Sequence, residues 1–305
     1  MGKDKEPNRY RLMLATYGGL TFTKPTVILL QETGLGVSEV AARTCYNSFD
    51  KSENGCVADF NAYLAEYADR EVTYENEVLG EINSIEHSKL LNDLAWTHFH
   101  YSISEHSVLS FLVKGTSRAV LQEAMRHRIA SPSVKSTRYT MAPIINAFVA
   151  ELSENTGNTE PSDWFINTLT DMDLFVTSDL KYNLIEINMI FTKLKYQYNK
   201  LGKEEFGKLT VAKSSLPFLE EAKSSPEVFK LLQSGKAKRN VGDNFKGIVT
   251  DFWKTDFVLT INLRSLKNFY TLRDSGASWV QIQWLAQAMK EATPKKYLDL
   301  IVKVK

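Results

Sequence analysis

A basic stretch interrupted by a proline, residues 126–139, constrains the fold more than any other part of this 305-residue chain. No Asp or Glu occurs from Ala124 to Ala150, although the whole chain carries 36 acidic and 37 basic residues. A proline cannot continue a helix, and it pushes the residue before it toward extended geometry. Pro132 therefore predicts a loop that is rich in hydroxyl groups and backbone N–H groups.

Four cations lie in this stretch without an acidic neighbour in the sequence: Arg126, Arg128, Lys135 and Arg138. A guanidinium group binds phosphate oxygens through two parallel hydrogen bonds, so the predicted loop is typical of an anion site. A solvated basic loop without a ligand has the same composition. Composition alone favours that simpler interpretation, because a short motif is only a hypothesis.

The overall composition limits the class of protein. With 43% hydrophobic residues the chain can bury a core, and its net charge of +1 gives no general attraction to nucleic acid or an anionic membrane. No run approaches the roughly 18 apolar residues that span a bilayer, and the first residues lack an apolar signal region. We therefore expect a soluble, cytoplasmic protein. Cys45 and Cys56 lack metal-ligand spacing, and the histidines lack a third regular ligand, so no metal is expected.

The spacing of apolar residues predicts the main elements. Arg43, on a first short helix capped by Ser38, is expected to be an ordinary exposed side chain, with phosphate binding as the alternative. The other predicted helices are residues 57–69, 77–99, 116–125 (capped by Thr116 or Ser117), 263–273 and 279–290, and the predicted strands are residues 108–113 (closed by Gly115) and 257–261. Residues 1–35 are expected to form an N-terminal extension with a strand. A helical insertion is expected at about 145–245, with helices at 174–201 and 226–232.

One motif resembles the signature of the flavin-dependent thymidylate synthases. It consists of Arg126-His127-Arg128, seven further residues, and then Ser136-Thr137-Arg138-Tyr139. Other segments agree with that family in the same order: residues 41–46, His100 with Glu105-His106, residues 262–269, and Arg273. The resemblance implies an α+β fold, with a small, mostly antiparallel sheet packed with helices, and a single catalytic domain over residues 1–305.

The resemblance also implies an activity and a site. The expected reaction is the methylation of dUMP to dTMP, with methylenetetrahydrofolate as carbon donor, NADPH as reductant, FAD as bound hydride carrier and no cysteine nucleophile. A homotetramer with shared sites is expected, without nucleic acid or membrane partners. The implied flavin contacts are His100, Ser102, Glu105, Arg126, His127, Arg128, Asn262, Arg264 and Asn268. The implied substrate contacts are Glu123, Ser136, Arg138, Lys246 and Arg273, of which Arg273 and Ser136 are the candidate catalytic residues.

Ser136 lacks a recognisable His-Asp relay, and an unassisted serine hydroxyl is a weak nucleophile, so we interpret it as a hydrogen-bonding residue near the pyrimidine. A structural polar pair at a strand entry remains an alternative for Glu105 and His106. The chain departs from the family's usual residues at Glu123, Ser133, Val134, Lys246, Gly276 and Val280. The changed residues Val134, Lys246 and Gly276 leave open a related flavoenzyme that installs hydroxymethyl instead of methyl. The basic loop leaves open a second alternative, a non-enzymatic nucleic-acid-binding protein.

Overall fold

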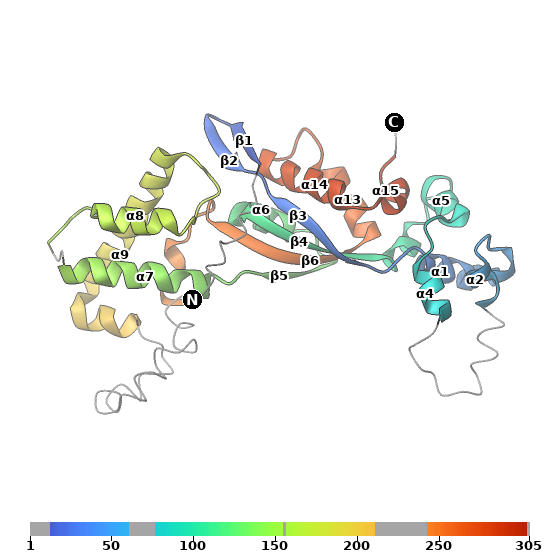
Figure 1. Ribbon diagram of the computed structural model, residues 1–305, viewed down its shortest axis with the longest axis horizontal. Helices are drawn as coiled ribbons and strands as arrows, with labels where there is room; N and C mark the ends of the chain where they lie inside the picture. Colours follow the sequence, from blue (N-terminus) through green and yellow to red (C-terminus); the bar gives the residue numbers. More distant parts are fainter. Residues whose placement is uncertain (1–12, 61–76, 155–156, 211–242, 304–305) are drawn as a thin grey trace, which may run out of the picture.

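The computed structural model describes residues 13–60, 77–154, 157–210 and 243–303. A central sheet lies between two groups of helices, one at each end of an elongated molecule (Figure 1). The sheet is antiparallel, has the strand order β3-β4-β6-β5, and is accompanied by a separate hairpin of β1 and β2. The strands are β1 (Leu14–Tyr17), β2 (Leu20–Thr23), β3 (Thr26–Glu32), β4 (Val108–Ser117), β5 (Ala130–Val134) and β6 (Lys254–Asn262).

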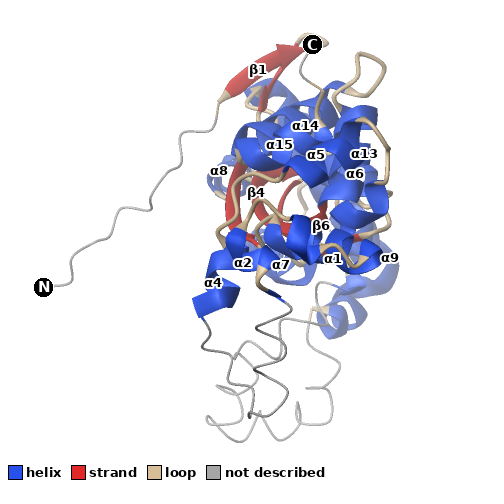
Figure 2. Cartoon of the chain, turned by 90° about the vertical axis from the view of Figure 1, so that its right-hand side faces the viewer, coloured by secondary structure: helices blue, strands red, loops and turns tan. Residues whose placement is uncertain are grey.

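Side chains alternate between buried and half-buried along β4 and β6, because successive residues of a strand point to opposite faces. Helices cover the buried face, and Figure 2 shows α13, α14 and α15 above β4 and β6. Apolar side chains of the strands and helices form one core on this face. The covering helices are α6 (Arg118–Ala124), α13 (Leu263–Arg273), α14 (Val280–Ala292) and α15 (Lys295–Ile301).

The two ends of the molecule are helical. One end contains α1 (Gly36–Tyr46), α2 (Gly55–Ala58), α4 (Glu77–Asn83) and α5 (Lys89–Trp96), with the short 3-10 helices η1 (Phe49–Lys51) and η2 (Tyr101–Glu105). The other end contains α7 (Thr137–Glu154), α8 (Asp163–Asp171), α9 (Leu180–Leu209) and the 3-10 helix η4 (Lys246–Ile248), which enclose a second core. One helical group therefore lies beyond each end of the central strands (Figure 1).

Several predicted elements differ in detail. Pro132 lies inside β5, which pairs with β6 alone among the described strands. The expected loop is therefore a short edge strand, one of the places in a sheet where a proline is tolerated. Strand β4 continues past Gly115, where a bulge and a φ of 72° accommodate the glycine. Strand β3 belongs to the central sheet, so the N-terminal extension ends before it. The predicted helix over 77–99 is two helices, α4 and α5.

Other predictions fail for reasons of packing. Residues 174–179 are not helical, because Phe175 and Thr177 form isolated bridges with Trp253 and Phe22. Ser38 does not cap α1 but lies inside it, where its hydroxyl contacts that of Ser107 at 2.7 Å. The prediction that Ser117 caps the helix preceding the basic stretch is confirmed, since its Oγ accepts a hydrogen bond from Val120 N.

Some predictions lie outside the described residues, namely the helix at 226–232 and most of the helix at 57–69. Arg43 is buried rather than exposed, and it pairs with Glu39, so the prediction of an ordinary surface side chain is wrong. Within the described part of the chain, no helix is long and apolar enough to cross a membrane. Among the same residues, no three His, Cys, Asp or Glu side chains come together as a metal site.

Candidate functional site

The register of the sheet brings three distant segments to one end of β6. Val108, the first residue of β4, pairs with Asn262, the last residue of β6. Ala130, the first residue of β5, pairs with Ile261. The 3-10 helix η2, which precedes β4, and the turn 126–129, which precedes β5, therefore both lie beside the start of α13.

Helix α13 begins directly after β6 because Asn262 caps it, with Oδ1 accepting a hydrogen bond from Ser265 N at 2.8 Å. The apolar residues of α13 face the core: Leu263, Leu266, Phe269 and Tyr270 are buried, as predicted. Residues three, four and seven positions after Arg264 share its face of the helix. This face carries Arg264, Lys267, Asn268 and Thr271 and points away from the core.

An open pocket of about 910 Å³ lies between this face and the turn that follows α6. Its lining residues are Tyr101, Arg126, His127, Arg128, Ile129, Arg264, Ser265, Lys267, Asn268, Thr271, Leu272 and Arg273. Five of them are Lys or Arg, and the described lining contains no Asp or Glu. The pocket is therefore suited to a large anionic ligand, because guanidinium groups bind phosphate oxygens in pairs of hydrogen bonds.

Two acidic side chains hold three of the pocket's four arginines in place. Glu123 pairs with Arg126 at 3.2 Å and with Arg273 at 2.9 Å, and its backbone carbonyl accepts a further bond from Arg273 at 3.3 Å. Glu105 pairs with Arg264, which joins η2 to α13. The side chains of Arg126 and Arg264 remain 71% and 53% exposed, so their guanidinium groups are open to a ligand.

His127 lies between Arg273 and the ring of Phe269. Arg273 Nε donates to His127 Nε2 at 3.0 Å, and the Phe269 ring packs edge-on with its centroid 4.8 Å away. Burial is the main cause that lowers the pKa of His127 below its ordinary value, and the charges of Arg273 and Arg126 lower this pKa further. The imidazole is therefore held in its neutral form.

Comparisons with known proteins agree with this pocket. Residues 28–297 match the protein family described as "Thymidylate synthase complementing protein". A relative from Wolinella succinogenes, named flavin-dependent thymidylate synthase, is 31% identical over 89% of this chain and 95% of that protein. The chain belongs to the flavin-dependent thymidylate synthase family. A relative of the same name from Campylobacter jejuni is 30% identical over 89% of this chain and 93% of that protein.

Solved structures show the same fold. A flavin-dependent thymidylate synthase from Helicobacter pylori, complexed with FAD and dUMP, superposes with a TM-score of 0.52 at 25% identity, covering 91% of this chain and 98% of that one. A second Helicobacter pylori structure, of thymidylate synthase X with FAD and dUMP, gives a TM-score of 0.53 at 24% identity, over 91% of this chain and 97% of that one. The predicted α+β class with a small antiparallel sheet is confirmed.

The structure brings most of the predicted flavin contacts to the pocket. Arg126, His127, Arg128, Arg264 and Asn268 line it, and Arg273 lines it as well. Glu105 and Asn262 lie just behind the lining, through the ion pair with Arg264 and the cap of α13. Ser102 is exposed on η2, next to the lining residue Tyr101. His100 borders a smaller neighbouring cavity, with Nδ1 3.4 Å from the hydroxyl of Tyr46.

Four predicted substrate contacts do not line this pocket. One of them, Glu123, lies behind the lining, where it pairs with Arg126 and Arg273. The other three lie outside the pocket altogether. Ser136 is half-buried between β5 and α7, and Arg138 is in the first turn of α7, with its side chain outside the described part of the structure. Lys246 is exposed on η4 and pairs with Asp243 at 3.2 Å, close to α7 and α9. These residues therefore lie toward the helical end that contains the second core.

Sequence reasoning missed Lys267, Thr271 and Tyr101 among the lining residues. A signal for the first two was present, because both share a helix face with Arg264. Tyr101 lies inside the His100-to-His106 motif, between two predicted contacts. Nothing in the sequence marks its ring as part of the pocket wall, since that depends on how η2 packs against α13.

Proposed function

We propose that this chain methylates dUMP to dTMP, with methylenetetrahydrofolate as carbon donor, NADPH as reductant and FAD as bound cofactor. The observation that carries this proposal is the cationic pocket between the turn 126–129 and α13. Its size and charge suit a dinucleotide with two phosphates. The names of the relatives, and the FAD and dUMP bound by the Helicobacter pylori enzyme, support the same ligands here.

The side chains of the pocket fit a flavin dinucleotide. Arg126, Arg128 and Arg264 present guanidinium groups for its phosphates, while Asn268 offers an amide for its ring system. His100, Ser102, Glu105, His127 and Asn262 complete the proposed flavin contacts. When bound, FAD supplies the hydride transfer that amino-acid side chains cannot perform.

Arg273 is the proposed catalytic residue for the pyrimidine. Its guanidinium would stabilise negative charge that develops on the pyrimidine oxygens. Glu123 and His127 restrain that guanidinium by contacts on both of its edges, which reduces the reorganisation needed during reaction. Preorganised charges of this kind contribute strongly to catalysis where water is excluded.

Glu123, which pairs with Arg273, is a further proposed substrate contact. Ser136, Arg138 and Lys246 are the remaining ones, with Ser136 near the reacting pyrimidine. Because these three residues lie outside the pocket of their own chain, we propose that they complete the pocket of a neighbouring chain in a homotetramer. Residues 1–305 then act as a single catalytic domain in which the segment at about 145–245 is a helical insertion. The family match over residues 28–297, which runs through both cores, supports a single unit.

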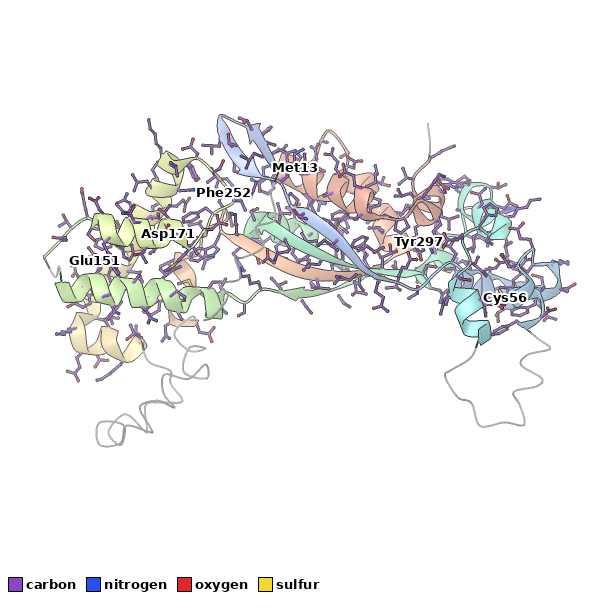
Figure 3. The ribbon with its side chains drawn as sticks, in the orientation of Figure 1. Met13, Cys56, Glu151, Asp171, Phe252 and Tyr297 are labelled. Atoms are coloured by element: carbon purple, nitrogen blue, oxygen red, sulfur yellow. The ribbon has the colours of Figure 1, made fainter. Side chains whose placement is uncertain are left out.

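No cysteine is assigned a catalytic role. Neither Cys45 nor Cys56 lines the pocket, and Cys56 lies at the helical end formed by α1, α2, α4 and α5 (Figure 3). Burial, followed by the charge of Glu81, raises the pKa of the Cys56 thiol and so disfavours the nucleophilic thiolate. A hydride route to thymidylate needs no covalent bond between the enzyme and the pyrimidine.

The test is the mass of the product formed from dUMP by the purified, FAD-loaded protein with methylenetetrahydrofolate and NADPH. Formation of dTMP supports the proposal. A product carrying hydroxymethyl instead of methyl would indicate the related reaction, which the unusual residues Val134, Lys246 and Gly276 motivate. Absence of any product from flavin-loaded protein would contradict both reactions.

A further inference from the structure

Lys267 has an environment that its role as a pocket-lining residue does not explain. Its Nζ atom is buried and has no hydrogen-bond partner among the described residues. Instead, Nζ lies 3.6 Å from the centre of the Tyr101 ring and 4.3 Å from the centre of the Trp96 ring. The ammonium group is thus held by two aromatic rings from two other elements, η2 and α5.

This arrangement has a physical cause. Burying an ammonium group without hydrogen bonds is costly, because the charged group loses its water. The negatively polarised faces of aromatic rings attract the cation, and this attraction is stronger where water is excluded. Both rings together therefore offset the cost of removing water from the Lys267 ammonium group. The stability of the buried ammonium group depends on the position of each ring.

The two rings are held unequally. Trp96 is fixed from behind, because its Nε1 donates to the carbonyl of Asp299 at 2.8 Å. No hydrogen bond of the Tyr101 hydroxyl is seen among the described residues, and a cavity of about 20 Å³ borders the Tyr101 side chain. That volume is enough for about one water molecule, so the packing beside Tyr101 is incomplete. Lys267 thus lies between a ring that is hydrogen-bonded at its edge and a ring that is not.

Tyr101 also lines the large pocket, together with Arg126 and Arg128 of the turn 126–129. It is the first residue of η2, whose last residue, Glu105, pairs with Arg264. A shift of the Tyr101 ring would therefore change the shape of the pocket beside the proposed flavin contacts. The position of this wall depends on the ammonium group behind it.

We propose that Lys267 is a positioning residue of the flavin pocket, which acts by holding the Tyr101 ring against the fixed Trp96 ring. The proposal rests on the proposed function, in which this pocket binds FAD. Lys267 itself need not contact the cofactor, because its Nζ is covered by the two rings. The cation, rather than the length of the side chain, is what the role requires.

The first test is the FAD affinity of Lys267→Met, a variant that keeps the length and apolar stem but removes the charge. We expect the Kd for FAD to rise about tenfold, within the range of a desolvated cation–aromatic contact, and the visible circular dichroism of bound flavin to change. Lys267→Arg should restore most of the affinity. Lys24→Met, which removes a cation over Trp284 at 5.6 Å outside this pocket, should leave FAD binding unchanged.

The second test asks whether Lys267 acts through Tyr101. In a Tyr101→Leu background, Lys267→Met should cause no additional loss of FAD affinity, because the ring it positions is absent. The proposal would be overturned if the losses of FAD affinity in the double variant were additive. It would also be overturned by native FAD affinity in Lys267→Met, or by a Lys267→Arg variant that binds FAD as weakly as Lys267→Met.

If Lys267→Met does not fold, the tyrosine variants decide. Tyr101→Phe, which keeps the ring, should bind FAD more tightly than Tyr101→Leu, which removes it; equal affinities of the two variants would overturn the proposal. Failure of the native protein to bind FAD would contradict the proposed function itself. Normal FAD binding by the native protein together with an unaffected Lys267→Met variant would contradict only the role of Lys267.

Discussion

Arg273 donates a hydrogen bond from its Nε to Nε2 of His127 across a distance of 3.0 Å. This contact joins the last residue of α13 to the turn that follows α6, so it connects the two sides of the pocket. Because Nε2 accepts the bond, the ring proton is assigned to Nδ1. The neutral ring therefore serves as a fixed acceptor for the proposed catalytic guanidinium.

This relationship predicts a dependence of stability on pH. The pKa of His127 in the folded protein is below its ordinary value of 6.5, so the unfolded chain binds the proton first as the pH falls. The contribution of His127 to the free energy of unfolding should therefore decrease as the pH falls below 6.5, and level off below the folded-state pKa. Thermal unfolding measured between about pH 5.5 and 7.5, one unit on either side of the ordinary pKa of 6.5, would check this.

The control is His127→Gln, which keeps an oxygen acceptor for Arg273 but does not titrate. The difference between the two stability curves isolates His127 from the other histidines of the chain. Curves that remain parallel across this pH range would show that His127 has no lowered pKa.

A second prediction concerns the exposed arginines of the pocket. Arg126→Ala or Arg128→Ala should each weaken FAD binding by about 1.5 to 3 kcal/mol, the contribution of a hydrogen bond to a charged group. Titration of the apoprotein with FAD, followed by flavin fluorescence, measures the effect. Arg118→Ala, at the start of α6 and outside the pocket, is the matched control. Unchanged affinity in both pocket variants would contradict the assignment of the flavin site.

A third prediction tests whether chains share sites. Arg273→Ala and Ser136→Ala should each be nearly inactive alone, because each removes one part of the proposed substrate site. Oligomers formed from an equal mixture should regain about a quarter of native activity, since a site built from two chains receives both native residues in about one case of four. Mixing Arg273→Ala with Arg264→Ala should restore none, because both residues belong to the same α13. Equal recovery in both mixtures would be inconsistent with shared sites.

The fourth prediction concerns the cysteines. The double variant Cys45→Ser, Cys56→Ser should keep most of its dUMP-methylating activity, because neither thiol lines the pocket. Removal of FAD should abolish that activity, since no side chain of the chain carries a hydride. Turnover assays on both preparations, with thermal unfolding to verify folding, provide the measurement. A folded double variant without turnover, or turnover by flavin-free protein, would refute the mechanism.

The parts of the pocket that could be predicted are those formed by residues close together in the sequence. The spacing of Arg264 and Asn268 predicts a shared helix face, and the buried residues of α13 follow the same period. The basic stretch was expected to bind an anion, and the structure places Arg126 and Arg128 in the cationic pocket. These predictions depend on residues within a few turns of one another.

The rest depends on contacts between distant segments. Strand β5 pairs with a single strand in the described part of the chain, and most of its side chains are exposed, so it lacks the alternation that marks a half-buried strand. Strand β3 pairs with β4, which lies far away in the sequence. No local sequence pattern indicates that these two strands are neighbours. The burial of Lys267 similarly requires Trp96 and Tyr101 from two other elements. Residue type alone predicts a solvated lysine there.

The proline in β5 also affects how separate molecules meet. An edge strand offers unpaired N–H and C=O groups to any other strand, and such edges are sites of aggregation. Pro132 removes one donor from this edge, and Lys135, just beyond the strand, adds a charge that discourages pairing. The edge of the sheet that leads from the pocket's arginines to Ser136 is thereby made less prone to strand exchange in a concentrated solution.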